Sequence, residues 1–307
     1  MNTPETPCQI IGPQRDQVGE SPVWHVGQQA LWWVDIEGRR LRRYRPADGS
    51  LAEWALPERA GCIALTQDGR VVAAMESRIA CLRPGPDGRL DDVQTLARID
   101  HPAPNMRFND GRCDASGRLW VGTMVMDRPE GSNLGGLYCL DERGLTGPHV
   151  SGLITPNGSG FSPDGRTFYL SDSHPTIQKI WTFDYDVQSA RLSGRRLFVD
   201  MTPLPGRPDG AAVDFEGTYW ICGNDAGQIH GFSPSGQRLR SLAVPVPKPA
   251  MCAFGGPDLR TLFVTSIVPG NAALDPDGLS GALLSLDAGT PGRAEPFFSR
   301  FPTAHGH

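Results

Sequence analysis

The sequence of 307 residues almost lacks helical periodicity. Gly, Pro or Asp interrupts nearly every window before three helical turns could form, because the chain holds 37 glycines and 28 prolines. Glycine shows no period of three and no segment is of low complexity, so neither a collagen-like nor a disordered chain is expected. What remains is short runs of β-branched and aromatic residues bounded by turn residues, which predict an all-β protein.

Signals for export, membrane insertion and nucleic-acid binding are also lacking. The N-terminus, MNTPETPCQIIGPQ, has neither the charged start nor the apolar core of a signal peptide, and no apolar stretch is long enough to span a membrane. The net charge of −5 argues against nucleic acid or an anionic membrane as a partner. The one basic cluster, RRLRRYR at 39–45, alternates with apolar residues and is interpreted as a solvated strand face.

The seven cysteines form an odd set without a CxxC pair. Most of them lie within expected strands, where a thiol behaves as a small apolar side chain. We therefore expect reduced, buried cysteines and a cytoplasmic location.

One pattern returns six times at intervals of roughly fifty residues, a period that indicates a repeat architecture. Each copy has a short apolar run, a turn that in most copies contains Gly, and a second apolar run. The copies are ESPVWHVGQQALWWVDI, GCIALTQDGRVVAAME, NDGRCDASGRLWVGTM, NGSGFSPDGRTFYLSDS, DGAAVDFEGTYWICGN and MCAFGGPDLRTLFVTSI. About four strands can be drawn within each repeat.

Four antiparallel strands repeated radially predict a six-bladed β-propeller, and residues 1–307 are expected to form this single domain. A sandwich has no reason to repeat its sequence, and the turns of a β-helix are shorter than these repeats. The segment around Ile10 and Ile11 lies outside the first copy. It is expected to supply the outer strand of the last blade, after strands at GALLSLDA and EPFFS, and so close the ring. Residues 303–307 are expected to be a frayed tail.

The repeats can be aligned on their turns. Seven or eight residues before each turn stand Glu20, Gly61, Asn109, Asn157, Asp209 and Met251. Loops that precede the innermost strands of a propeller gather at the channel mouth, so the four oxygen-bearing residues of this set are expected to meet there. Confining two ionised carboxylates in one channel costs several kcal/mol of free energy, because the charges repel each other and lose solvation. A bound cation removes this cost. Carboxylate and amide oxygens suit Ca²⁺, Mg²⁺ or Mn²⁺ and tolerate Zn²⁺ or Fe²⁺.

Each of these four residues also has a purely structural explanation. Asn157-Gly158, Asp209-Gly210 and the stretch Asn109 to Gly111 are favoured turn sequences, and Glu20 could be a solvated loop charge. Their coincidence at one repeat position favours a site. No HxxxH or Ser-His-Asp grouping is visible, so nucleophilic hydrolase chemistry has little support.

Along nearly its whole length the chain resembles the regucalcin/gluconolactonase family of six-bladed propellers, which includes senescence marker protein-like sugar lactonases. The motifs that carry the resemblance are GESPVW, RFNDGRCDASGRLWVGTM, PNGSGFSPDGRTFYLSD, DYD, RPDGAAVD and AFGGPDLRTLFVTS, in that order. Members of this family are metal-dependent lactonases that act on sugar lactones.

The resemblance implies roles for five residues. Glu20, Asn157 and Asp209 would bind one divalent metal, and Arg107 and Asn109 would face the substrate. Asp209 would also be the general base, with the metal acting as a Lewis acid on the lactone carbonyl. One departure concerns a substrate-contacting Glu of some members, because ungapped alignment puts Gly131 at its position and Glu130 is one residue out of register.

The leading hypothesis is therefore a sugar lactonase that hydrolyses an aldonolactone, such as a glucono-, galactono-, xylono- or arabinonolactone, to its acid. Two alternatives stay open: a related propeller esterase or phosphotriesterase, and a non-catalytic calcium-binding propeller. The expected partner is a small-molecule sugar lactone, with neither nucleic acid nor membrane. Since a closed propeller has few exposed strand edges, a monomer is expected.

Overall fold

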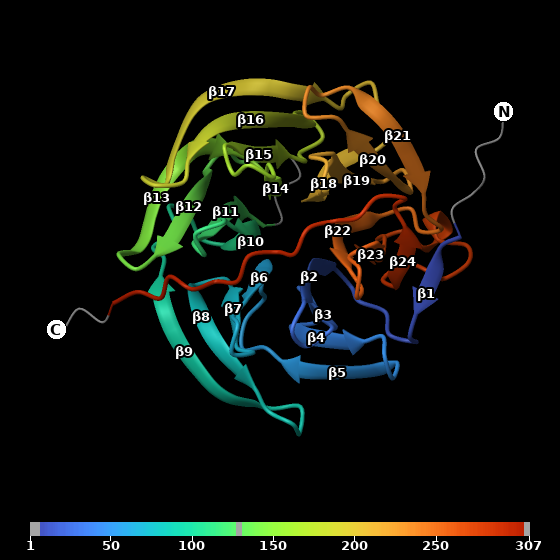
Figure 1. Cartoon of the computed structure of the whole chain (residues 1–307), viewed down its shortest axis with the longest axis horizontal. Helices are drawn as coiled ribbons and strands as arrows, with labels where there is room; N and C mark the ends of the chain where they lie inside the picture. Colours follow the sequence, from blue (N-terminus) through green and yellow to red (C-terminus); the bar gives the residue numbers. More distant parts are fainter. Residues whose placement is uncertain (1–6, 127–130, 304–307) are drawn as a thin grey trace.

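The computed structural model describes residues 7–126 and 131–303 and has six blades around a central axis (Figure 1). Each blade is one four-stranded antiparallel sheet. The predicted six-bladed β-propeller is thereby confirmed. Within the described residues, the one helical element is a 3₁₀ turn, η1 (Ala272–Leu274). Those residues contain no helix with the length and apolar character needed to cross a membrane.

The blades follow one another in chain order, with the first strand of each nearest the axis (Figure 1). Blade 1 is β2 (Gly19–His25), β3 (Ala30–Asp35), β4 (Arg40–Arg45) and β5 (Ser50–Ala55); blade 2 is β6 (Cys62–Leu65), β7 (Val71–Ala74), β8 (Arg78–Pro84) and β9 (Leu90–Arg98); blade 3 is β10 (Met106–Cys113), β11 (Leu119–Val125), β12 (Gly135–Asp141) and β13 (Gly144–Leu153). Blade 4 is β14 (Pro156–Phe161), β15 (Thr167–Asp172), β16 (Lys179–Asp186) and β17 (Arg191–Asp200); blade 5 is β18 (Arg207–Val213), β19 (Tyr219–Asn224), β20 (Gln228–Phe232) and β21 (Arg238–Ala243); blade 6 is β22 (Pro249–Gly255), β23 (Thr261–Ser266), β24 (Leu283–Asp287) and β1 (Gln9–Ile11).

Burial follows the position of a strand in its blade. The inner strands β2 and β22 are buried at every residue, and apart from Glu20 and His25 of β2 their residues are apolar or small. The outer strand β17, in contrast, is mostly exposed and carries three arginines. The second strands of blades 1, 3 and 5 each bury a tryptophan: Trp33, Trp120 and Trp220. Six of the seven cysteines are also buried, and all seven are free thiols, as predicted. Adjacent blades therefore pack through large apolar side chains.

The N-terminal strand closes the ring, as predicted. β1 pairs antiparallel with β24, with Gln9 opposite Ser285 and Ile11 opposite Leu283. Blade 6 is thus built from both ends of the chain, and β1 leads directly into blade 1.

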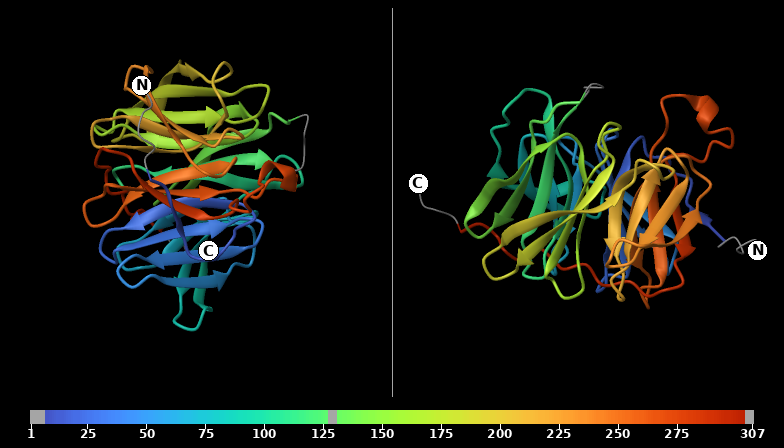
Figure 2. Two further views of the ribbon diagram at one scale, coloured as in Figure 1. Left: turned by 90° about the vertical axis from the view of Figure 1, so that its right-hand side faces the viewer. Right: turned by 90° about the horizontal axis from the view of Figure 1, so that it is seen from above.

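The predicted strand at EPFFS, residues 295–299, is wrong. β1 already occupies the outer edge of β24, so this segment has no ladder to join. It runs instead across one face of the ring (Figures 1 and 2). The backbone N–H of Phe298 donates to Leu65 of blade 2 at 2.8 Å, and that of Ser299 donates to Gly117 of blade 3 at 3.0 Å.

The tail is also more ordered than predicted at its first residue. The N–H of Thr303 donates to the carbonyl of Glu142 at 3.0 Å, so Thr303 is held on blade 3. The other tail residues, 304–307, lie outside the described residues.

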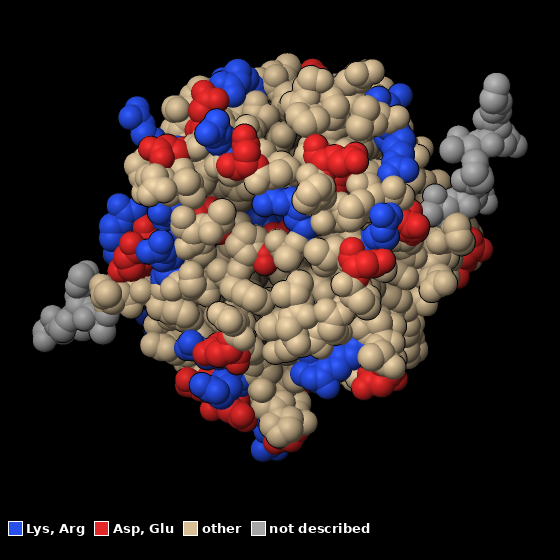
Figure 3. Space-filling view, in the orientation of Figure 1, with Lys and Arg blue, Asp and Glu red and all other residues tan. Residues whose placement is uncertain are grey.

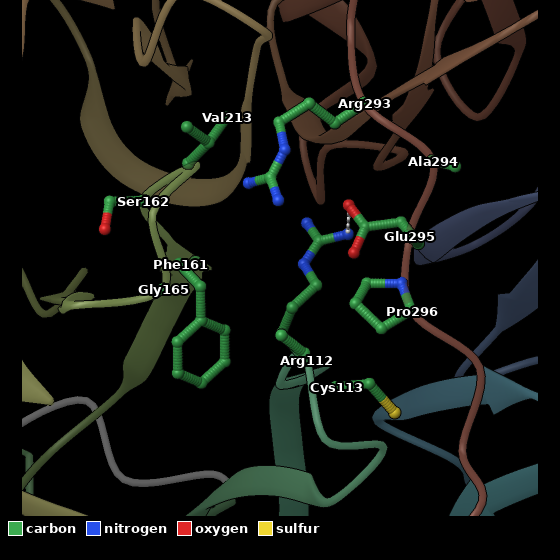
Figure 4. A pocket seen from close by; sticks show the side chains of 12 residues that line it. Arg112, Cys113, Phe161, Ser162, Gly165, Val213, Arg293, Ala294, Glu295 and Pro296 are labelled. Carbon is green, nitrogen blue, oxygen red and sulfur yellow. Dashed lines mark hydrogen bonds and ion pairs between the residues drawn. The ribbon is translucent and has the colours of Figure 1, made fainter. Parts of the chain in front are cut away.

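The C-terminal segment crosses one mouth of the channel and is held there by a part-buried ion pair. Arg112 of β10 donates to Oε1 of Glu295 at 2.8 Å (Figure 4). The Arg112 guanidinium also donates to the carbonyls of Ser159 and Ala211, so one side chain links blades 3, 4 and 5. On this face of the molecule acidic and basic side chains are interspersed (Figure 3).

Irregular pairing at the start of the first strands shapes the opposite mouth. In five blades the ladder between the first and second strands shifts by one residue, at Glu20/Val23, Phe108/Gly111, Asn157/Gly160, Pro208/Ala211 and Pro249/Cys252. Such a bulge re-aims side chains without ending the strand. These shifts coincide with the repeat positions that carry the predicted site.

Candidate metal centre and substrate cavity

The four predicted oxygen-bearing residues lie inside strands rather than in the preceding loops, which corrects the sequence prediction. Glu20 is in β2, Asn109 in β10, Asn157 in β14 and Asp209 in β18. From the sequence alone these positions resemble turns, because Gly directly follows Asn157 and Asp209. In the structure those glycines serve the bulges: Gly158 has φ of +60°, and a Cβ on it would lie 2.4 Å from the Tyr219 hydroxyl.

All four residues and Arg107 line one cavity of about 170 Å³ that is open to solvent. The cavity is at the mouth opposite the C-terminal segment. The strands show this: Glu20 is at the start of β2, whereas His25 at its end packs against Phe297 of that segment, with ring centroids 4.9 Å apart. The predicted residues are therefore brought together at one end of the channel.

A chain of hydrogen bonds connects the amides across blades 3 and 4. Asn109 Nδ2 donates to Oδ1 of Asn157 at 2.9 Å and to the Pro156 carbonyl at 2.8 Å. Asn157 Nδ2 in turn donates to Ser173 Oγ at 2.5 Å, and Arg107 donates to Asn109 Oδ1 at 2.5 Å. The orientation of each amide is therefore fixed by its neighbours, and Asn157 keeps one oxygen lone pair for a further partner.

The two carboxylates of the cavity are buried and lack a salt-bridge partner within the described residues. Glu20 Oε2 accepts from the backbone N–H of Ser21 at 3.0 Å, and Asp209 Oδ2 accepts from Asn224 Nδ2 at 2.6 Å. Burial, and then repulsion from Asp209 and Asp110, raises the pKa of Glu20 well above its usual value. Burial also raises the pKa of Asp209 to about 7, although the bond from Asn224 opposes the rise. Both shifts mark carboxylates whose charge is not balanced by the protein.

This donor set fits a hard divalent cation. The described residues contain no group of three or more His, Cys, Asp or Glu side chains that could hold a metal, so a third protein ligand would be a neutral oxygen. Asn157 Oδ1, with its free lone pair, is placed for that role beside Glu20 and Asp209. Oxygen donors of this kind are typical ligands of Ca²⁺, Mg²⁺ and Mn²⁺, whereas structural zinc sites use thiolate ligands.

A third buried carboxylate, Asp110, was not predicted. This residue is 3% exposed, and its Oδ2 accepts from the Ser159 N–H at 2.7 Å. Its Oδ1 has no hydrogen-bond partner in the part of the chain that the structure describes. Burial raises the pKa of Asp110, and the nearby Arg112 opposes this. Asp110 thus adds negative charge between the predicted metal ligands and the Arg112–Glu295 pair.

Other cavity residues were also missed: Ser173, Arg207, Asn224 and Lys248. A signal for two of them was present. The second strand of each blade runs antiparallel to the first and ends at the mouth where the first begins, so the residues after FYLSD and at the end of YWICGN had to face the cavity. Arg207 immediately precedes the PDG motif. Lys248 stands in a connecting segment, where the repeat alignment gave no guide.

The structure explains the departure at Gly131. This glycine has φ of +76°, and a Cβ on it would lie 2.8 Å from His174 Nε2 and 3.0 Å from Ile154 Cγ2. Gly131 is not among the residues that line the cavity. A substrate-contacting side chain is therefore disfavoured at this position by conformation and by space. Glu130 lies outside the described residues.

Comparison with known proteins assigns the family. Residues 18–268 match the family model described as "SMP-30/Gluconolactonase/LRE-like region". The chain is 38% identical to the 6-deoxy-6-sulfogluconolactonase of Pseudomonas putida over 93% of its own length and 96% of that protein. It is 34% identical to a pentonolactonase of Haloferax volcanii, over 91% and 94% of the two chains.

A solved structure agrees with these relatives. The calcium-binding protein regucalcin from Agrobacterium tumefaciens superposes with a TM-score of 0.87 at 25% identity, covering 96% of this chain and 98% of that one. Fold, motif order and family model point the same way, and the chain belongs to the SMP-30/gluconolactonase/LRE-like family.

Proposed function

We propose that this protein is a sugar lactonase that holds one divalent cation through Glu20, Asn157 and Asp209 and uses Asp209 as its general base. One observation carries the proposal: two buried carboxylates without an ion-pair partner in the described residues line the same cavity as an amide oxygen and a guanidinium. An unbalanced pair of this kind is costly unless a cation joins it.

The relatives give the reaction class. Two of them are named as lactonases of sugar acids, one of a sulfogluconolactone and one of a pentonolactone. We carry over from these names only ring opening of a sugar lactone to the corresponding acid. The names differ in the charge of the substrate, so they leave the substrate of this protein open.

The cavity residues have separate tasks in this proposal. A bound divalent cation would supply Lewis-acid stabilisation of the oxyanion that develops on the lactone carbonyl. Asp209 would take the proton of the attacking water, and Asn224 fixes the carboxylate through its bond to Oδ2. Arg107 presents guanidinium donors to the substrate oxygens, and Asn109 holds Arg107 in place.

The environment of the site supports hydrolysis at a defined position. Val18, Ile36 and Ile267 line the cavity between the polar groups. Apolar walls limit the number of water molecules around a bound substrate and strengthen the polar contacts that remain. A cytoplasmic location and a monomeric state stay predictions from the sequence.

A lactone panel tests the proposal. Protein stripped with a chelator is titrated with Ca²⁺, Mg²⁺, Mn²⁺ and Zn²⁺ while the hydrolysis of aldono-1,4- and 1,5-lactones is followed by proton release. The proposal requires turnover that depends on the added metal. Metal binding without turnover of any lactone would contradict it and support a non-catalytic calcium-binding propeller. Turnover of aryl esters or phosphotriesters alone would support the esterase alternative.

A further inference from the structure

The cavity carries more positive charge than hydrolysis of a neutral lactone needs. We infer that the preferred substrate is a sugar lactone with a second, anionic group, and that Arg207 and Lys248 bind this group. The inference rests on the proposed function, because it concerns the substrate of the same site.

The charges of the cavity lining divide into two sets. The carboxylates of Glu20 and Asp209 are committed to the divalent cation of the proposed function. Three cationic side chains, those of Arg107, Arg207 and Lys248, line the same space. With the cation bound, the two carboxylates no longer balance these side chains, and the cavity attracts anions.

Arg207 and Lys248 share a single carboxylate. Arg207 Nε donates to Asp225 Oδ2 at 2.6 Å, and Lys248 Nζ pairs with the other oxygen of Asp225. Two cations beside one carboxylate leave one positive charge in excess. Both side chains are mostly buried, with 27% and 21% exposed, so solvent screens this excess only in part.

Donors of this pair also remain free. Arg207 Nη1 donates to the Ser173 carbonyl at 3.1 Å, but its Nη2 makes no hydrogen bond within the described residues. The Lys248 ammonium has three N–H groups and, among residues 7–126 and 131–303, makes one hydrogen bond, to Asp225. An oxyanion with several acceptor oxygens matches these unused donors, because bonds between charged groups are the stronger ones.

The positions of the cations around the ring separate two ends of the substrate. Arg107 comes from β10 of blade 3, whereas Lys248 directly precedes β22 of blade 6, which lies across the ring. Arg207 starts β18 of blade 5, next to blade 6. Arg107 is therefore available to the lactone end and the carboxylate that forms there. Arg207 and Lys248 are left for a charge at the far end of the sugar.

The test compares three lactones that differ only at carbon 6: glucono-1,5-lactone, its 6-deoxy-6-sulfonate and its 6-phosphate. Metal-loaded wild-type protein should show kcat/KM at least tenfold higher for one or both anionic lactones. This preference should shrink as NaCl is raised from 50 mM to 500 mM, because the attraction is electrostatic. The sulfonate and phosphate arms tell a monoanion from a dianion, and either preference supports the inference.

Variants assign the preference to the two residues. The double variant Arg207→Gln/Lys248→Gln should lower the ratio of kcat/KM for anionic over neutral lactone at least tenfold. Arg196→Gln is the control: it removes one positive charge where the double variant removes two, but Arg196 lies on outer strand β17, where it pairs with exposed Asp184. The control should keep the wild-type ratio.

Binding gives a second readout. Calorimetry of metal-loaded protein with the sulfonated open-chain acid should show affinity that the double variant weakens at least tenfold and the control does not. Efficient hydrolysis of the neutral lactone with no preference for anions, or an unchanged ratio in the double variant, would overturn the inference and leave the proposed function standing. If metal-loaded protein hydrolyses neither these three lactones nor any member of the aldonolactone panel, the proposed function fails and this inference fails with it. Turnover within the panel but of none of these three lactones would overturn the inference alone.

Discussion

Asn109 Nδ2 donates a hydrogen bond to Asn157 Oδ1 at 2.9 Å and so joins the inner strands of blades 3 and 4 at the cavity. The same Asn109 accepts from Arg107 through Oδ1 at 2.5 Å. One amide thereby orients a proposed metal ligand and a proposed substrate-binding guanidinium. Its two ends have opposite hydrogen-bonding character, so a carboxylate of the same shape cannot replace it.

Asn109→Asp tests this dual role. The new carboxylate can still accept from Arg107 but cannot donate to Asn157, so the Asn157 amide loses the bond that fixes its oxygen. We expect metal affinity to fall about 10- to 100-fold, the usual effect of losing a partner of a ligand. Calorimetric metal titration of the wild type and the variant measures this. Equal affinities would show that the bond does not position Asn157.

Asp209→Asn should nearly abolish turnover while the fold survives. The asparagine oxygen can still accept the bond from Asn224, which the structure gives as 2.6 Å, so local packing is kept. An amide cannot take a proton, and a loss of kcat of at least 10²-fold is expected from removing a general base. Steady-state kinetics, with circular dichroism to verify the fold, decide the point. A kcat within a few-fold of wild type would show that another group is the base.

Removal of the metal should lower thermal stability, because a ligand that binds only the folded state stabilises it. At a metal concentration about 100 times Kd the stabilisation is about 2.7 kcal/mol. Addition of a chelator should therefore lower Tm by several degrees, and excess divalent metal should restore it. In Glu20→Gln the same addition should shift Tm less, since one ligand charge is gone. If added metal raised the Tm of that variant as much as the Tm of the wild type, Glu20 would not be a metal ligand.

The fold could be predicted because each blade repeats the same requirement. Six copies of one hairpin pattern cannot bury their apolar faces except against one another, and this requirement fixes the ring. The meeting of Glu20, Asn157 and Asp209 in one cavity could be predicted for the same reason, because equivalent repeat positions point toward a common axis.

What could not be predicted depends on contacts between segments far apart in the sequence. EPFFS has the composition of a strand, but a strand also needs a free ladder, and β1 had already taken the edge of β24. Lys248 reaches the cavity from a connecting segment that no repeat position marks. The bulges that turn Asn109 and Asp209 inward are visible only in the pairing register.

Asp16 should make stability depend on pH at the ring closure. Its carboxylate accepts from Trp33 Nε1 at 2.7 Å and Arg42 Nε at 2.6 Å, and its N–H donates to the Gly281 carbonyl at 2.8 Å. Burial nevertheless outweighs the attraction of Arg42 and raises the pKa of Asp16 from 3.8 to about 6. The folded state thus holds this proton more tightly than the unfolded chain, and the difference amounts to at most about 3 kcal/mol.

The sign of the effect follows from that difference. The stabilisation from the bound proton is complete below about pH 4 and is lost as the pH rises to about 6. Asp16→Asn, which has no proton to lose, should gain stability relative to wild type between pH 4.5 and pH 7. Urea unfolding of both proteins at pH 4.5 and pH 7 measures how the difference in unfolding free energy between variant and wild type changes with pH. A relative loss of stability in the variant would show that the Arg42 pair dominates over burial.

Glu295→Gln should destabilise the protein through the group that it leaves behind. Arg112 is 5% exposed, and Glu295 is its one carboxylate partner in the described residues. Without that charge the guanidinium keeps the carbonyls of Ser159 and Ala211 and the attraction of buried Asp110, and losing one partner of such a pair costs up to about 3 kcal/mol. Asp184→Asn, in the exposed pair with Arg196, is the control and should leave the unfolding free energy nearly unchanged. If both variants unfold at the same urea concentration as wild type, the C-terminal segment is held by Phe298 and the backbone bonds to Leu65 and Gly117, and not by the ion pair.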